Sequence, residues 1–289
     1  MTMSDEPKNF LNLPPEHTGR ASRYAVLPVP YEGTVSYLPG TAEGPAAILS
    51  ASAQVEYFDE ELGGEFIEAG VMTCPMLEPA SGPEEQMRRV REAAGAIVAE
   101  GKFLLTLGGE HSISTPLVEL QAERHGEISV LQIDAHADLR DEYRGSRFSH
   151  ACVMRRALEI TGSLCQVGIR SYSSQEARQC PEQVGKFFTP PLIASQEDWI
   201  GRVVASLREN VYVTVDIDGF DPAFAPGTGT PEPGGLDWRQ VTGLLRRVCR
   251  ERQVVAADIV EVRPIPPSHI TEYLAARLAY KIIAYTQQA

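Results

Sequence analysis

The 289-residue chain carries 39 acidic and 26 basic side chains, which gives a formal net charge of −13 at pH 7. This acidic balance argues against nucleic acid and anionic membrane surfaces as partners, and it favours cationic ligands. Hydrophobic residues make up 43% of the sequence, a share typical of a well-packed globular domain.

The cysteines and the amino-terminal residues favour a cytoplasmic location. Five cysteines are scattered along the chain without a CxxC pair, which favours free thiols in a reducing compartment over a disulfide framework. Residues 1–10 are polar and acidic and contain no apolar stretch of the kind found in signal peptides. The sequence has no run of about 18 apolar residues, so we expect no membrane-spanning helix.

The pattern of apolar residues predicts strands and helices that alternate along the chain. Residues 1–23 are expected to form a polar, extended N-terminal arm, and residues 24–289 a single domain. Residues 31–44 are rich in Gly, Pro, Ser and Thr, which predicts a long loop. A short helix is expected to begin at Gly44 and Pro45, since proline is favoured in the first helical turn.

Near-continuous apolar strands that alternate with helices predict an α/β fold whose parallel sheet is covered on both faces. The expected strands are residues 24–29, 102–107, 128–133, 164–169, 211–215 and 254–262. The expected longer helices are residues 83–99, 112–123, 151–160, 175–180, 196–207, 236–250 and 270–285.

The stretch that follows the strand at 128–133 has the composition of a metal site. Asp134, His136 and Asp138 alternate with two alanines, and residues two apart in extended chain point to the same side. Two carboxylates and one imidazole would therefore converge on one point. A D-x-H-x-D string alone is moderately specific, because an acidic surface loop can carry the same residues.

Two further strands end in residues of the same kind. His111 follows the strand at 102–107 and two glycines, and Asp216 and Asp218 follow the strand at 211–215. Each is weak evidence alone, since a lone histidine or an Asp-rich turn is common in loops. In open α/β sheets, however, ligands collect at the carboxyl ends of the strands.

Together the three strand ends supply two histidines and four aspartates, a set that suits two hard divalent cations such as Mn²⁺. Six side chains are few for two ions, so at least one carboxylate must bridge them. Four aspartates balance the charge of two divalent ions, and a bridging hydroxide would leave the centre slightly negative. Such a centre favours a cationic substrate over a phosphate.

The chain resembles the ureohydrolases, most closely their agmatinase branch. The motifs that carry the resemblance are GGEHS at residues 108–112, DAHAD at 134–138, SHACVMRR at 149–156, DIDGFDPAFAPGTGTP at 216–231 and VEV at 260–262. The resemblance spans about residues 24–285, and it implies a three-layer α/β/α sandwich around a central, mainly parallel sheet. It also implies a binuclear manganese centre, with two Mn²⁺ per subunit, that hydrolyses a guanidinium group to urea and an amine.

The resemblance also implies roles for individual residues. His150 matches a histidine thought to shuttle protons, Glu261 matches the acid that holds the guanidinium group, and Asp138 is the candidate to pass on the proton of the nucleophile. One manganese would be bound by His111, Asp134, Asp138 and Asp216, and the other by Asp134, His136, Asp216 and Asp218. Family members form trimers and hexamers, so we expect a homotrimer or a homohexamer.

The substrate is expected to be a small cationic guanidino compound. Asp141 and Glu142 follow the DAHAD string and favour a second positive charge, which fits agmatine. We therefore expect agmatine to be cleaved to putrescine and urea, with N1-aminopropylagmatine as an alternative substrate. Arg140, Arg144 and Arg147 leave 4-guanidinobutyrate open. The alternatives are a metallohydrolase of another electrophile, such as a phosphoester, and a catalytically silent relative that acts as a binding protein.

Overall fold

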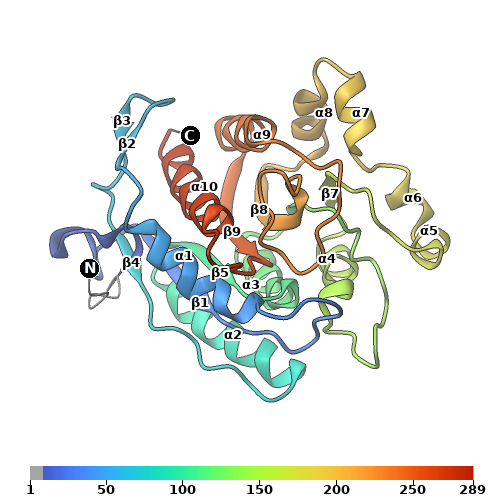
Figure 1. The fold of residues 1–289 in the computed structure, drawn as a ribbon, viewed down its shortest axis with the longest axis horizontal. Coiled ribbons are helices and arrows are strands. Elements are labelled where there is room, and N and C mark those ends of the chain that lie inside the picture. Colours follow the sequence, from blue (N-terminus) through green and yellow to red (C-terminus); the bar gives the residue numbers. More distant parts are fainter. Residues whose placement is uncertain (1–8, 289) are drawn as a thin grey trace.

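A seven-stranded sheet forms the centre of the molecule, which we describe from a computed structural model over residues 9–288 (Figure 1). The strand order is β4-β1-β5-β9-β8-β6-β7, and every pairing within this sheet is parallel. Its strands are β1 (Tyr24–Val29), β4 (Val71–Thr73), β5 (Phe103–Gly108), β6 (Ile128–Ile133), β7 (Leu164–Val167), β8 (Asn210–Asp216) and β9 (Gln253–Val260). A separate antiparallel hairpin consists of β2 (Phe58–Asp59) and β3 (Gly64–Glu65).

Helices cover both faces of the sheet, so the fold is a three-layer α/β/α sandwich. One layer contains α1, α8, α9 and α10, and the other contains α2, α3 and α4. Both layers bury apolar side chains against the sheet, in two separate hydrophobic cores. The helices are α1 (Gly44–Ser52), α2 (Pro83–Ala99), α3 (Ser114–His125), α4 (Val153–Thr161), α5 (Ser174–Gln179), α6 (Pro181–Val184), α7 (Pro190–Ser195), α8 (Trp199–Ser206), α9 (Trp238–Glu251) and α10 (Ile270–Thr286).

The strand register explains where the site lies. Leu107, Ile259, Val215 and Ile133 are paired in one row across β5, β9, β8 and β6. These are the four central strands, and parallel strands place their carboxyl ends at the same edge of the sheet. The residues that follow this row therefore meet over the middle of the sheet.

The structure differs from the sequence-based expectation near the amino terminus. Residues 1–8 lie outside the described range, but residues 9–22 do not form an extended arm. Phe10 and Leu11 lie in a 3-10 turn and are buried. The backbone N–H of Leu11 donates to Ser52 Oγ at 2.9 Å, and this contact ties the segment to α1.

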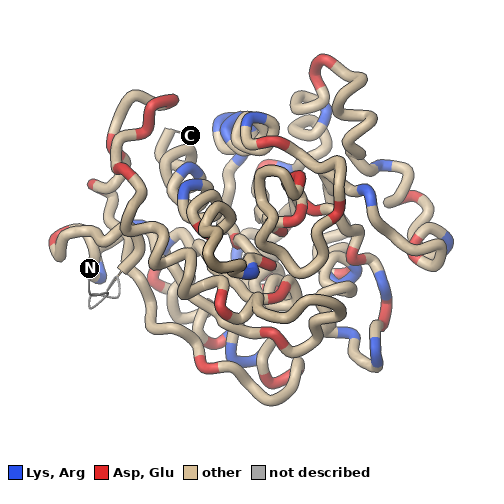
Figure 2. The backbone as a smooth tube through the Cα atoms, in the orientation of Figure 1, with Lys and Arg blue, Asp and Glu red and all other residues tan. Residues whose placement is uncertain are grey.

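Charged residues are distributed over the whole backbone, with acidic and basic positions interspersed (Figure 2). The helices in the described part of the chain include none with the length and hydropathy needed to cross a membrane.

Candidate metal centre

Two glycines bring the loop after β5 into the site. The backbone N–H of Gly109 donates to Val29 O and that of Glu110 to Tyr31 O, both at 2.8 Å. A Cβ atom on Gly109 would lie 2.1 Å from Tyr31 O, so only glycine allows the two loops to approach this closely. This close approach places His111 over the sheet edge.

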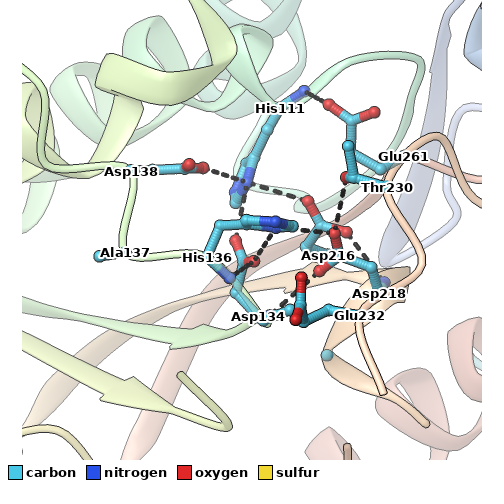
Figure 3. Close-up of polar contacts among 12 residues, drawn as sticks. His111, Asp134, His136, Ala137, Asp138, Asp216, Asp218, Thr230, Glu232 and Glu261 are labelled. Carbon is cyan, nitrogen blue, oxygen red and sulfur yellow. Dashed lines mark hydrogen bonds and ion pairs between the residues drawn. The ribbon is translucent and has the colours of Figure 1, made fainter. Parts of the chain in front are cut away.

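The ring of His111 points into a group of carboxylates (Figure 3). Its Nδ1 lies 3.2 Å from Asp134 Oδ2, 3.2 Å from Asp138 Oδ2 and 3.4 Å from Asp216 Oδ2. Although this nitrogen is buried, it has no hydrogen-bond partner among the described residues. The ligand atoms of His111, Asp134 and Asp216 lie within 4.8 Å of one another, as metal binding requires.

A second group of potential ligands adjoins the first and shares Asp134. His136 Nδ1 lies 2.9 Å from Asp218 Oδ2 and 3.7 Å from Asp134 Oδ1. Asp134, His136 and Asp218 also hold their ligand atoms within 4.8 Å of one another. Two adjacent groups with a shared carboxylate are the arrangement that a pair of metal ions needs.

The charges of this cluster require a cation. Burial and the neighbouring Asp218 and Asp138 carboxylates raise the pKa of Asp134 to about 7. Burial and the same kind of repulsion raise the pKa of Asp216. Like charges held this close disfavour ionisation of Asp134 and Asp216, and a divalent ion removes the conflict. The described residues therefore fit a site for hard divalent cations, with carboxylate oxygens and imidazole nitrogens as ligands.

A chain of hydrogen bonds behind the cluster orients His111. Its Nε2 lies 2.8 Å from Thr214 Oγ1, and the hydroxyls of Thr214 and Tyr212 both donate to the carboxylate of Asp258. All four residues are buried. Because Nε2 faces Thr214, Nδ1 is the nitrogen left to bind a cation.

Asp138 and Glu261 lie at the same site, both in a backbone conformation with positive φ, 52° and 63° respectively. Non-glycine residues rarely adopt this conformation, and it concentrates at functional sites. Glu261 Oε1 accepts the backbone N–H of His111 at 2.8 Å. Burial and the neighbouring Glu110 raise the pKa of Glu261, so a cationic partner would stabilise its ionised form.

The cluster opens into a cavity of about 310 Å³. His150 lies in its wall, and burial lowers the pKa of this histidine. Metal-type ligands, Glu261 and His150 are thus brought together around one space. Other residues that line this space are Val35, Ser36, Tyr37, Leu38, Arg140, Tyr143, Tyr172, Glu176 and Thr230.

The structure does not support a substrate-binding role for Asp141 and Glu142, because neither lines this cavity. The carboxylate of Asp141 turns toward α4, where its Oδ1 lies 2.6 Å from an Arg156 nitrogen. The acid on this side of the cavity is Glu176, which accepts the backbone N–H of Leu139 at 3.0 Å.

Sequence reasoning did not identify Thr34, Thr214 or Thr230 as parts of the site. Thr230 Oγ1 donates to Asp218 Oδ2 at 3.2 Å. Threonine in a strand or a loop is too common to indicate a site. Thr230 is the one of the three that the sequence could have indicated, because it lies in the long motif at residues 216–231.

Comparisons with known proteins agree with this geometry. The model of the arginase family matches residues 22–284. An N(1)-aminopropylagmatine ureohydrolase of Synechocystis is 39% identical over 96% of this chain and 94% of its own length. An agmatinase of Bacillus subtilis is 34% identical over 82% of each chain. The crystal structure of an agmatine ureohydrolase of Thermoplasma volcanium is 30% identical, has a TM-score of 0.86 and covers 95% of this chain and 94% of its own.

The family match spans the sheet, the helices and both ligand groups, and the relatives align over nearly their whole lengths. The chain is therefore a member of the arginase family, a ureohydrolase of the agmatinase type that acts on carbon–nitrogen bonds of guanidino compounds.

Proposed function

We propose that the chain hydrolyses N1-aminopropylagmatine to urea and the corresponding polyamine. The observation that carries the hydrolysis is the half-buried carboxylate of Glu261, which lines the same cavity as members of both ligand groups. The choice of substrate is supported by the Synechocystis enzyme of that name, which is 39% identical, whereas the Bacillus subtilis agmatinase is 34% identical. Agmatine, which the sequence alone favoured, is the second candidate.

The charge of the cavity supports a substrate with more than one cationic group. Two divalent ions would offset the four aspartates of the ligand groups. The cavity wall then retains two further acids, Glu261 and Glu176, and one basic residue, Arg140. Arg140 Nε lies 4.0 Å from Glu176 Oε2. The excess of negative charge favours a guanidinium group that is followed by a protonated amine, and it disfavours 4-guanidinobutyrate.

Manganese is the proposed metal, because carboxylate-dominated sites with some imidazole suit Mn²⁺. His111, Asp134, Asp138 and Asp216 would hold one ion, and Asp134, His136, Asp216 and Asp218 the other, with Asp134 and Asp216 shared. When bound, two such ions supply Lewis-acid activation of the attacking water near neutral pH.

The protein's own residues then have distinct tasks. Glu261 binds and orients the planar guanidinium group through paired, charge-assisted hydrogen bonds. Water adds to the guanidinium carbon, and the bond from that carbon to the alkyl nitrogen breaks. Asp138 takes up the proton of the attacking water, and His150 delivers a proton to the departing amine. Urea and the protonated amine, which has gained both protons of the water, are the products.

The test is urea release by the Mn²⁺-loaded protein from N1-aminopropylagmatine, agmatine, arginine and 4-guanidinobutyrate. We expect the highest kcat/KM with N1-aminopropylagmatine and no turnover by Asp134→Asn, a near-isosteric change in one of the two shared ligands. Faster turnover of agmatine would overturn the substrate assignment but keep the chemistry. No urea from any of the four compounds would overturn the proposed function.

A single catalytic domain over residues 24–289, a homotrimeric or homohexameric assembly and a cytoplasmic location belong to the same proposal. They rest on the resemblance to the family and on the sequence, and light scattering of the purified protein tests the assembly.

A further inference from the structure

Glu110 is a buried carboxylate that belongs to neither ligand group. Its Oε2 accepts the backbone N–H of Thr34 at 2.6 Å, and its Oε1 accepts the Thr34 hydroxyl at 2.8 Å. The hydroxyl of Ser112 also donates to Oε1, at 2.5 Å. Glu110 is fully buried, so these hydrogen bonds are shielded from water and fix the position of Thr34.

Thr34 in turn contacts His150 through one oxygen atom. Thr34 Oγ1 accepts the backbone N–H of His150 at 3.0 Å and lies 3.1 Å from His150 Nδ1. A threonine hydroxyl has one proton and two lone pairs. Because that proton is donated to Glu110, the oxygen can only accept from the ring. Nδ1 must therefore carry the proton, and Nε2 is left unprotonated in the neutral imidazole.

We propose that Glu110 and Thr34 are positioning residues that fix the ring and the neutral tautomer of His150, so that Nε2 is the atom that exchanges protons in the cavity. The inference rests on the role proposed for His150. The Tyr143 ring packs against the same ring in a T-shaped arrangement, with centroids 5.9 Å apart and planes at 82°, and limits its rotation.

The tautomer determines how protons balance in the reaction. Nε2 accepts a proton that originates from the attacking water, and the ring becomes a cation with Nδ1–H directed at Thr34. When the carbon–nitrogen bond breaks, the electron pair stays on the amine nitrogen, and Nε2 returns the first proton to it. The second proton of the water leaves the hydroxyl as the carbonyl of urea forms and passes to the amine, so that a guanidinium cation and water give neutral urea and an alkylammonium ion. The ring ends the cycle in its starting tautomer.

The alternative is that Glu110 and Thr34 only anchor the loop that carries Val35, Tyr37 and Leu38 in the cavity wall. Anchoring alone predicts a higher KM or a lower Tm when the hydroxyl is removed. It predicts no change in the pH dependence of kcat and no change in the protonation of the ring.

The experiment compares Thr34→Val, Thr34→Ser and Thr41→Val. Thr41 is the control, because it lies in the same stretch after β1 and donates its hydroxyl to a glutamate, Glu32, at 3.1 Å. Thr41 is fully buried, whereas Thr34 is half-buried. We expect Thr34→Val to lower kcat by about 10- to 100-fold with little change in KM. Thr34→Ser, which keeps the hydroxyl, should retain most of the activity, and Thr41→Val should match the wild type.

The pH profile of kcat separates positioning from anchoring. The charges of Asp138, His111 and His136 also act on the pKa of His150, and all three residues are unchanged in Thr34→Val. Loss of the acceptor for Nδ1–H disfavours the imidazolium, so the limb of the profile that reports His150 should move to lower pH. A profile identical to that of the wild type, with or without a lower kcat, would overturn the proposal.

Nitrogen-15 NMR of histidine-labelled protein tests the tautomer without turnover. Mg²⁺ replaces Mn²⁺ in this sample to avoid paramagnetic broadening, and His150→Gln assigns the signal. We expect Nδ1–H in the neutral wild type and a mixture of tautomers in Thr34→Val. A wild type protonated at Nε2 would overturn the inference. Absence of urea release by an enzyme with the expected tautomer would instead overturn the proposed function.

Discussion

The hydrogen-bond chain behind His111 shows how single residues prepare the site. The Asp258 carboxylate accepts from Thr214, and Thr214 lies beside His111 Nε2. Such partners of a metal-binding histidine hold its ring in one orientation and raise its basicity. Because the chain is buried, no water replaces a missing partner.

Replacement of Asp258 by Asn should therefore weaken metal binding. Thr214 and Tyr212 donate to different oxygens of Asp258, and asparagine replaces one of these oxygens by an NH2 group, which cannot accept. The amide also carries no charge, so we expect a loss of about 10- to 100-fold in Mn²⁺ affinity. Titration calorimetry measures the affinity. Tyr212→Phe removes one donor and leaves the chain to His111 intact, so its loss should be smaller. Equal affinities in Asp258→Asn and wild type would contradict this account of His111.

Protonation of the ligands should make the stability of the metal-free protein depend on pH. The pKa of Asp134, raised to about 7 by burial, Asp218 and Asp138, is higher in the fold than in the unfolded chain. The protonated Asp134 side chain therefore stabilises the fold fully at pH values below the pKa of Asp in the unfolded chain. This contribution is lost as the pH rises from there through about 7. Burial alone would lower the pKa of His136, but Asp218 and Asp134 raise it to about 11, so its contribution also declines above about pH 6.5.

We therefore expect the chelator-treated protein to have a lower Tm at about pH 8 than at about pH 5. Mn²⁺ should raise the Tm more at the higher pH, because protons compete with the ion for the ligands at the lower pH. Thermal unfolding with chelator and with Mn²⁺ at both pH values measures this. Asp134→Asn should show a weaker pH dependence, and a metal-free protein that is more stable at the higher pH would refute the argument.

At the scale of elements, the site depends on how closely the loops after β1 and β5 approach each other. Gly109 has no room for a side chain, since its Cβ would meet Tyr31 O, and its carbonyl accepts the Glu261 backbone N–H at 2.7 Å. A side chain here would displace the loop that carries both Glu110 and His111.

Gly109→Ala should destabilise the fold by at least about 2 kcal/mol and reduce urea release. The matched control is Gly95→Ala in α2, where a Cβ meets no atom within 4 Å. That change should stabilise the protein by about 1 kcal/mol, because alanine has the higher helix propensity. Chemical denaturation measures both. A Gly109→Ala variant as stable as the wild type would show that the loops can separate without cost.

The elements that were predicted correctly are those whose sequence pattern is continuous. The strands expected at 24–29 and 128–133 coincide with β1 and β6, and the helix expected at 83–99 coincides with α2. In contrast, β4 has three residues and the hairpin strands β2 and β3 have two each, too few to show a period. Their pairing follows from the tertiary fold.

Prediction of the site is also limited to residues that lie in a continuous local pattern. The metal-type residues cluster within short motifs at strand ends, so the sequence indicates them. Thr34 lies 76 residues from Glu110 and 116 from His150, and no local pattern joins the three. Asp141 shows the opposite error, since its place in the sequence suggested the cavity, whereas Arg156 holds it outside.

At the scale of the whole molecule, a buried ion cluster joins the N-terminal third of the chain to the last helix. Lys281 of α10 is 1% exposed, and its Nζ lies 2.9 Å from Asp59 and 3.0 Å from Glu61. The hydroxyl of Tyr285 donates to Glu61 at 2.6 Å. The hairpin of β2 and β3 is too small to be stable alone, so these contacts determine where it lies.

Lys281→Met should destabilise the protein by about 3 kcal/mol or more, because it leaves Asp59 buried without its closest cation. The double variant Asp59→Asn/Lys281→Met should recover part of this loss, since no unpaired charge remains. Arg247→Met breaks two surface ion pairs, with Asp198 and with Glu251, and should change stability by less than about 1 kcal/mol. Urea denaturation measures all three variants. If Lys281→Met loses no more stability than Arg247→Met, the hairpin is held by its apolar contacts, and the ion cluster only selects its orientation.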